Sequence, residues 1–226
     1  MLEFPAKQFN SILLKRNISV DLLANRAKIS LAKLQKISAS GGSLNEEEAS
    51  QLAEELAVPL TAFFVNQDIP TAVLIDFRTK QNELIVPRSS LLSALRYIEH
   101  ISATLVGVGA NTELSPELSP IECGFSTKEA KLLAAKWRTK WGLTISQQLE
   151  MSDAGKLYDH LRKYIESLGA FVMHCSIDDR RVSGFYTKIN GGPHTIVINT
   201  KTNNTGRRSF TLAHEFGHLI TRKEGV

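Results

Sequence analysis

The chain has 226 residues, of which 42 % are hydrophobic and 22 % are charged. These fractions are close to the globular average and exclude a fibrous or largely disordered protein. No apolar run approaches the roughly 18 residues that a membrane span needs, and the first ten residues lack the pattern of a signal peptide. The two cysteines, Cys123 and Cys175, cannot form a disulfide framework. We therefore expect a cytoplasmic protein that does not associate with membranes.

The net charge of +4 is unevenly distributed along the chain. Between Lys7 and Lys36, seven basic residues accompany a single acid, whereas residues 37–68 contain six acids and no Lys or Arg. A basic half of a small module is typical of proteins that bind nucleic acid. Charges on solvated helix faces would give the same counts, so both interpretations stay open on charge alone.

The first 66 residues predict five short helices joined by short turns. Ser19 and Ser30 are suitable N-caps for the second and third helices. Gly41-Gly42 interrupts the helical pattern, and three consecutive acids after Asn45 favour the start of a fourth helix. The fifth helix ends near residues 63–64.

The rest of the chain predicts a mixture of helices and strands. Residues 67–86 form a connector with one extended piece at 72–75. Apolar periodicity then predicts helices over 88–106, 127–141, 153–168 and 206–222, a loop over 107–126, and strands over 170–173, 182–187 and 195–199.

The expected class is α+β, with an all-α helical bundle followed by a domain that holds a small antiparallel sheet. A turn at Asn190–Pro193 favours a hairpin between the last two strands. We divide the chain into a helical domain at 1–68, a connector with a long helix at 69–126, and a C-terminal domain at 127–226.

The last predicted helix contains a His-Glu-x-x-His motif. His214 and His218 are four residues apart, so that a helix places both imidazoles on one face, where they can bind one Zn²⁺ ion. Glu215 lies beside them and can act as a base toward water without being a metal ligand. We expect an apolar arc of this helix to pack against the core; it consists of Phe210, Ala213, Gly217 and Ile220. A polar helix edge with structural histidines is the alternative interpretation.

A catalytic zinc site takes three protein ligands, and the motif supplies two. The third normally follows the second histidine, but only eight residues follow His218, and Glu224 is close to it in sequence. His174, Cys175 and His194 are upstream alternatives on or near predicted strands. The residues leave this choice open, and we expect the C-terminal domain to be incomplete.

Together these residues resemble the ImmA/IrrE family of zinc metallopeptidases. The resemblance covers about residues 70–226 and rests on four segments: Asp76-Phe77-Arg78, Gly184-Phe185-Tyr186, Ile196–Asn199 and Arg208–Leu219. It implies a zincin-like, intracellular endopeptidase whose relatives cleave a Cro-like repressor. In that case His214 and His218 are Zn²⁺ ligands and Glu215 is the catalytic base.

Residues 1–66 resemble the Cro/repressor-type (XRE) helix-turn-helix that some members of the family carry. Leu23-Ala24 and Ile29-Ser30 match its pattern, although Lys28 stands where the motif usually has a turn glycine. The resemblance places the recognition helix at Ser30–Ile37. It implies contacts with DNA by four residues of this helix, namely Ser30, Lys33, Gln35 and Lys36. A helical bundle that contacts proteins is the alternative.

The resemblance thus implies a two-part transcriptional regulator. Its N-terminal module binds DNA, and its C-terminal domain uses zinc to cleave a repressor-type protein. The alternative is a DNA-binding regulator whose zincin-like domain senses a ligand or a metal without catalysis.

Overall fold

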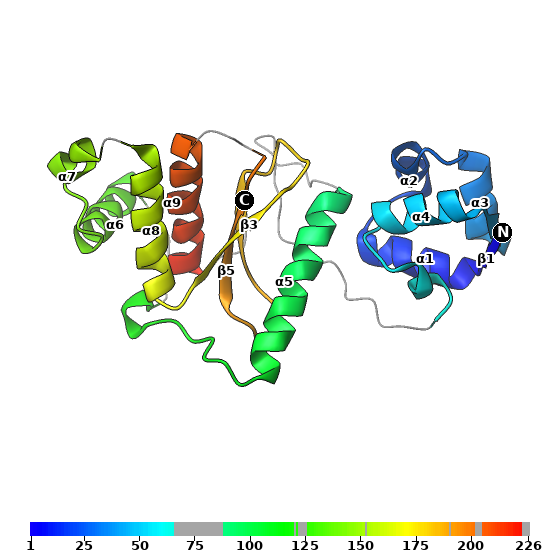
Figure 1. Cartoon of the computed structure of the whole chain (residues 1–226), viewed down its shortest axis with the longest axis horizontal. Helices are drawn as coiled ribbons and strands as arrows, with labels where there is room; N and C mark the ends of the chain where they lie inside the picture. Colours follow the sequence, from blue (N-terminus) through cyan, green and yellow to red (C-terminus); the bar gives the residue numbers. More distant parts are fainter. Residues whose placement is uncertain are drawn as a thin grey trace. The chain divides into compact units, whose positions relative to one another are not determined.

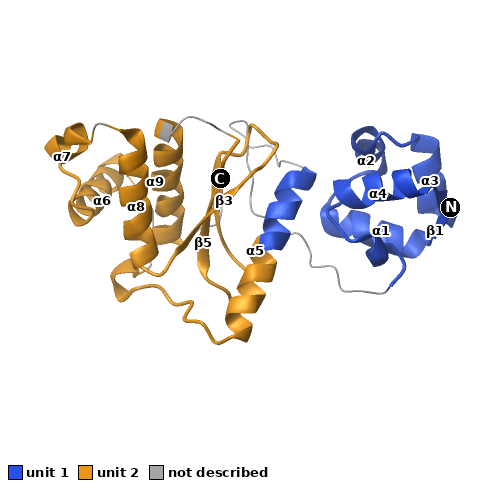
Figure 2. Ribbon diagram, viewed as in Figure 1, with its two compact units in different colours: residues 1–74, 84–97 blue, residues 75–83, 98–226 orange. Residues whose placement is uncertain are grey.

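The computed structural model divides into two compact units, one made of residues 1–74 and 84–97 and the other of residues 75–83 and 98–226 (Figures 1 and 2). The architecture is α+β, as predicted. None of the helices within the described residues is both long and apolar enough to cross a membrane. The structure describes residues 1–65, 88–119, 121, 126–151, 153–189, 191–201 and 205–222. The predicted extended piece at 72–75 and the segment Asp76-Phe77-Arg78 lie outside them.

The first unit is a helical bundle around one apolar core. Its elements up to residue 65 are β1 (Leu2–Phe4), α1 (Ala6–Arg16), α2 (Val20–Ala27), α3 (Leu31–Ser40), β2 (Gly42–Leu44), α4 (Glu46–Glu55) and the 3₁₀ helix η1 (Leu60–Phe63). The five predicted helices are confirmed. The antiparallel pair of β1 and β2, in which Leu2 lies opposite Leu44, was not predicted.

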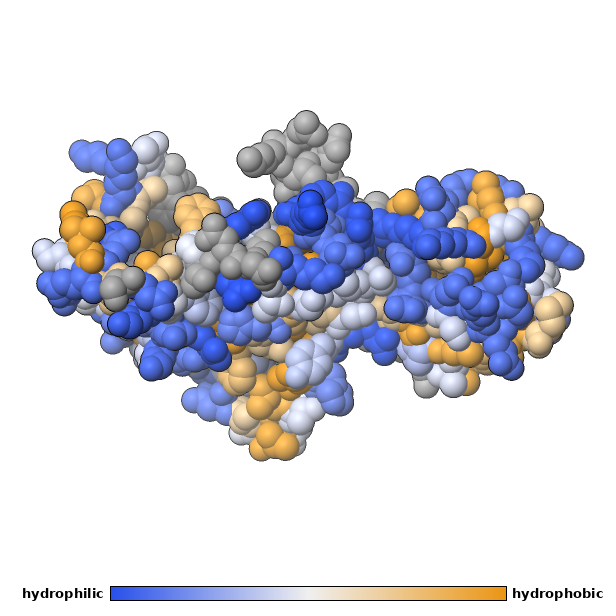
Figure 3. All heavy atoms as spheres, turned by 45° about the horizontal axis from the view of Figure 1, so that its top comes forward, coloured by the Kyte–Doolittle hydropathy of each residue, from blue (hydrophilic) through white to orange (hydrophobic). Residues whose placement is uncertain are grey.

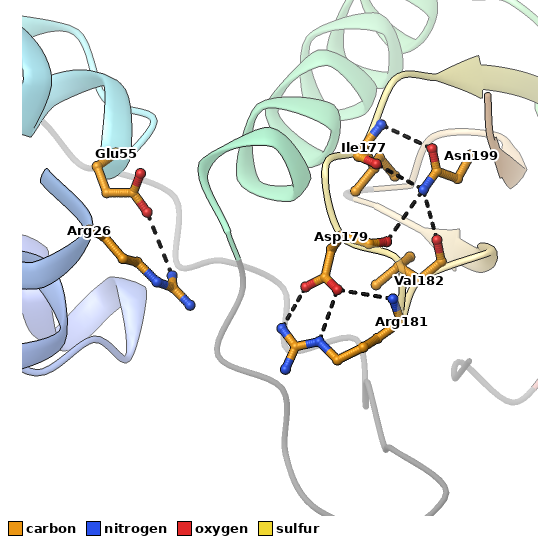
Figure 4. Close-up of polar contacts among 7 residues, drawn as sticks. All are labelled: Arg26, Glu55, Ile177, Asp179, Arg181, Val182 and Asn199. Carbon is orange, nitrogen blue, oxygen red and sulfur yellow. Dashed lines mark hydrogen bonds and ion pairs between the residues drawn. The ribbon is translucent and has the colours of Figure 1, made fainter. Parts of the chain in front are cut away.

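Side chains fix the ends of these helices. The Ser19 hydroxyl accepts a hydrogen bond from the first turn of α2, as predicted, and Asn45 forms a capping box with Glu48 on α4. The buried Arg16 guanidinium donates to the carbonyl of Leu56, which follows α4. Arg26 of α2 pairs with Glu55 of α4 at 3.6 Å (Figure 4). These contacts hold α1, α2 and α4 together and leave α3 with an exposed face.

The second unit combines helices with a three-stranded sheet. Its described elements are the part of α5 (Ser89–Gly107) from Ile98 on, η2 (Pro116–Leu118), α6 (Thr127–Lys140), α7 (Ile145–Glu150), α8 (Ala154–Ser167), β3 (Phe171–Cys175), β4 (Gly184–Lys188), β5 (His194–Asn199) and α9 (Thr205–Thr221). Helices α8 and α9 lie side by side, and α9 packs on β4 and β5 (Figure 1). The core lies between them and includes Leu161, Ile165, Leu212, Phe216 and Leu219.

The expectation of a purely antiparallel sheet is wrong. The strand order is β3-β5-β4, and β4 forms the predicted antiparallel hairpin with β5, but β3 runs parallel to β5. Parallel strands need a long crossover, and residues 176–193 supply one, because they include a loop, β4 and the hairpin turn. The central strand β5 is buried along its whole length.

The end of β5 is tied to the loop before β4 by one side chain. The Asn199 amide donates to the carbonyl of Val182 at 2.8 Å and to that of Ile177 at 2.9 Å, and its oxygen accepts from the N–H of Ile177 (Figure 4). In the same loop the Arg181 guanidinium donates two hydrogen bonds to the carboxylate of the buried Asp179. The loop therefore holds β4 in a fixed position next to α9.

Candidate functional site

The helix α9 approaches the sheet closely at Gly184, the first residue of β4. A Cβ atom at this position would stand 2.6 Å from Cγ2 of Thr211 and 2.7 Å from the carbonyl oxygen of Val197. No larger residue fits there without movement of the helix or the sheet. The close approach brings the side chain of Glu215 beneath β4.

His214 and His218 point their Nε2 atoms at one another, 3.3 Å apart. Two nitrogens bound to one tetrahedral zinc ion, each at 2.0–2.1 Å, are about 3.3–3.4 Å apart. The spacing of the two side chains therefore fits a shared zinc ion. The two side chains lie on one face of α9, because a helix of regular pitch stacks residues i and i+4.

Glu215 is almost entirely buried, with 2 % of its surface exposed. Its carboxyl group accepts a hydrogen bond from the backbone N–H of Tyr186, and its Oε2 atom has no partner among the described residues. Burial raises the pKa of this carboxyl to about 8, although the Tyr186 N–H opposes the shift. The unpartnered Oε2 atom leaves one side of this carboxyl group without a hydrogen bond, on the helix that carries the two converging imidazoles.

The upstream candidates for a third ligand do not join the two histidines. Within the described part of the chain, no group of three His, Cys, Asp or Glu side chains could hold a metal ion. His174 is hydrogen-bonded to the Tyr158 hydroxyl at 2.7 Å, and His194 to the Tyr186 hydroxyl at 2.6 Å. Cys175 is buried in β3, and Glu224 lies outside the described residues.

A cleft of about 1050 Å³ opens beside the histidines, and both of them line it. One wall belongs to α6 and includes Leu133, Ala134 and Trp137. The other belongs to α9 and includes Phe210, Ala213 and Gly217.

The cleft corrects the predicted orientation of α9. Phe210 is 71 % exposed, and of the predicted apolar arc only Ile220 is buried. The sheet and α8 pack against α9, and Leu212, Phe216 and Leu219 form the core contact instead. Phe216 also packs edge-on against Trp137 and Trp141.

The four predicted DNA-binding residues lie at or on α3. Ser30 precedes the helix and its side chain makes no capping hydrogen bond, while Gln35 and Lys36 are exposed. Lys33 is also exposed but pairs with Glu48 of α4 at 2.5 Å. This ion pair was not predicted, because it depends on the packing of α3 beside α4.

Comparison with known proteins gives one family match. Residues 165–226 match the family Peptidase_M78, described as the IrrE N-terminal-like domain. The matched segment begins in α8 and includes the sheet and α9 with the whole His-Glu-x-x-His motif. It supports the resemblance to the ImmA/IrrE family and favours a metallopeptidase-like function. No curated protein and no solved structure matches the chain.

Proposed function

We propose that the chain is a zinc-dependent peptidase in which His214 and His218 hold the metal and Glu215 is the catalytic base. The observation that carries the proposal is the 3.3 Å separation of the two Nε2 atoms next to a buried, partly unpartnered carboxyl group. When bound, zinc would supply a Lewis acid that polarises the scissile carbonyl and activates water. A third ligand has to come from outside the described residues or from a second molecule.

The proposed role of Glu215 is to accept a proton from the attacking water and to pass it to the leaving amine. The Tyr186 N–H fixes one side of the carboxyl group, and Gly184 packs against the same side chain, since a Cβ atom there would lie 3.5 Å from Cγ of Glu215. A base held in this way needs little reorganisation during the reaction.

For the substrate we propose a repressor-type protein, which rests on the family resemblance. The test is co-expression of the chain with a Cro-like repressor, with cleavage measured on a gel and bound zinc measured by elemental analysis. We expect cleavage by the wild type and a loss of about 10²–10⁴-fold in Glu215→Gln, which should retain its zinc. Zinc binding without any cleavage would instead identify a non-catalytic sensor domain.

We also propose that the first unit is a helix-turn-helix that binds DNA. The pair α2–α3 supports this function, because three residues join the helices and the exposed face of α3 carries Gln35 and Lys36. The test is binding of the full chain to duplex DNA by fluorescence anisotropy over a salt series. We expect Lys36→Ala to reduce the salt slope by about one unit. Lys33→Ala should reduce it less, because Lys33 is paired with Glu48. No binding at low salt would favour a module for protein contacts.

A further inference from the structure

We infer that the cleft between α6 and α9 selects polypeptides with a large apolar side chain next to the bond that is cut. The inference rests on the proposed peptidase function and adds the class of substrate. Its starting point is position: His214 and His218 both line the cleft. A side chain seated in the part of the cleft beside the two histidines would hold its own backbone near their Nε2 atoms.

The chemistry of the walls favours an apolar occupant. Most of the lining residues are aliphatic, aromatic or small, and among those that the structure describes Arg138 alone carries a permanent charge. The Arg138 guanidinium already donates to the side-chain oxygen of Gln148. A lysine or arginine of a substrate would find no carboxylate among these residues. Burial of its charge would therefore be unfavourable.

The size of the cleft favours a large occupant. At about 1050 Å³ it reaches the upper end of the roughly 300–1,000 Å³ that is usual for ligand sites. The space exists because small residues face it from both walls, Ala134 on α6 and Ala213 and Gly217 on α9. A Cβ atom at Gly217 would have no atom within 4 Å. Phe210 adds an exposed ring stacked on the His214 imidazole at 6.3 Å.

The α6 wall is a feature of this chain beyond the family match. Helix α6 spans Thr127–Lys140, whereas the match begins at residue 165. The neighbouring surface is also apolar, since Leu132 on α6 and Ile145 and Leu149 on α7 are 63–79 % exposed. Figure 3 shows apolar atoms at the surface of this end of the unit. An extended peptide with several apolar residues fits such a surface better than a charged one.

The two tryptophans of the chain, Trp137 and Trp141, both line the cleft and provide a direct readout. We would titrate the zinc-loaded full-length Glu215→Gln variant, which should not cut, with three peptides, acetyl-Ala-Ala-X-Ala-Ala-amide with X as Phe, Ala or Lys. Intrinsic fluorescence should change saturably. We expect the Phe peptide to bind at least about 10-fold more tightly than the other two, within the 10–200-fold discrimination of apolar pockets.

Filling the cleft should remove this preference. In the same background Gly217→Phe should bring the dissociation constants of the three peptides within about 2-fold of each other. Ala103→Phe is the matched control, because Ala103 is exposed on α5 and does not line the cleft; it should leave the preference unchanged. Circular dichroism and zinc content check that each variant is folded. If Gly217→Phe does not fold, Ala134→Trp fills the cleft from the opposite wall.

Three results would overturn the inference: a flat titration for every peptide, equal affinities in the unfilled protein, or a preference that survives in both Gly217→Phe and Ala134→Trp. The proposed function fails separately. If the Phe peptide is preferred but the zinc-loaded wild type cuts none of the peptides or repressors offered, the apolar selectivity of the cleft stands and the peptidase function does not.

Discussion

Gly184 and Thr211 pack so closely that a Cβ atom on the glycine would stand 2.6 Å from Cγ2 of the threonine. One residue of β4 thus sets the distance between the sheet and the helix that carries both histidines. The same Cβ atom on Gly184 would lie 3.5 Å from Cγ of Glu215. A displacement of the helix at this point therefore also displaces the proposed base.

Gly184→Ala should therefore destabilise the protein by about 1–3 kcal/mol, the usual cost of overpacking a core. It should also lower the proposed peptidase activity, because a shift of α9 moves Glu215 relative to the Tyr186 N–H on β4. Urea denaturation measures the first effect and the repressor cleavage assay the second. Gly107→Ala is the control, since a Cβ atom there meets nothing within 4 Å. Equal midpoints for Gly184→Ala and the wild type would contradict the packing argument.

His214→Ala should lower zinc content and thermal stability together. A metal that binds only the folded state stabilises it, so loss of one of the two proposed ligands should remove both effects. His174→Ala and His194→Ala should retain the zinc, because the rings of His174 and His194 bond to tyrosines instead. Zinc content by elemental analysis and melting temperature with and without EDTA give the comparison. Undiminished zinc in His214→Ala would exclude the proposed metal site.

The stability of the metal-free protein should fall as the pH rises from 6.5 to about 8. The pKa of Glu215 is raised in the folded chain from an ordinary value of 4.5 to about 8. The folded state therefore holds a proton that the unfolded state releases. The stability that this proton contributes to the folded state is fully present below pH 4.5. It is lost as the pH rises through 8, at up to about 1.4 kcal/mol per pH unit.

Glu215→Gln should flatten this slope, as urea denaturation in EDTA would measure. Below pH 6.5 the opposite effect of His194 has to be separated, because burial lowers the pKa of its imidazole to about 4. Stability from His194 is present above pH 6.5 and is lost as the pH falls through 4. Burial lowers the pKa of His174 as well, so its effect also falls below pH 6.5. Between pH 6.5 and 8 the difference in slope between the wild type and Glu215→Gln therefore reports the glutamate. Identical slopes in the wild type and Glu215→Gln would show that this carboxyl does not hold the proton.

Lys28→Gly should stabilise the first unit by about 0.5–1 kcal/mol. Lys28 follows α2 with φ at +55°, a left-handed conformation that costs a residue with a Cβ atom more than glycine. Lys36→Gly is the matched control, since it places glycine inside α3 and should destabilise by about 1 kcal/mol. Chemical denaturation of the full chain, followed by circular dichroism, compares the two. A loss of stability in Lys28→Gly would mean that the lysine side chain contributes more than the turn costs.

Local patterns in the sequence predicted most of the helices but missed elements that depend on distant partners. Helix α9 follows from its apolar spacing, and the turn at Lys28 follows from its place between two short helices. Helix α7 has only six residues, and Ile145 and Leu149 on it are exposed, so it has no buried stripe to detect. Its capping box of Thr144 and Gln147 was the available signal. The three-residue strands β1 and β2 exist only because they pair with each other.

The candidate site likewise has features that one helix determines and features that depend on residues distant in the sequence. The spacing of His214 and His218 is a property of one helix and could be predicted. The burial of Glu215 depends on Gly184, which lies about 30 residues earlier in the sequence. The α6 wall of the cleft depends on Trp137, which lies still further from α9 in the sequence. No periodicity within a segment carries information on such contacts. The apolar arc was assigned to the core for this reason, although Phe210 lines an open cleft.

The mixed sheet also imposes an order on folding. The hairpin of β4 and β5 closes over a short turn, whereas the parallel pair requires Phe171 to pair with Thr195, and all of β4 lies between these two residues in the sequence. The β4–β5 pairing should form faster, because closing the shorter loop costs less conformational entropy. We expect amides of β4 to be protected before those of β3 in pulse-labelled hydrogen exchange, and the reverse order would contradict this. The surface on which α9 docks would then form first, and β3 would complete the sheet around a helix already in place.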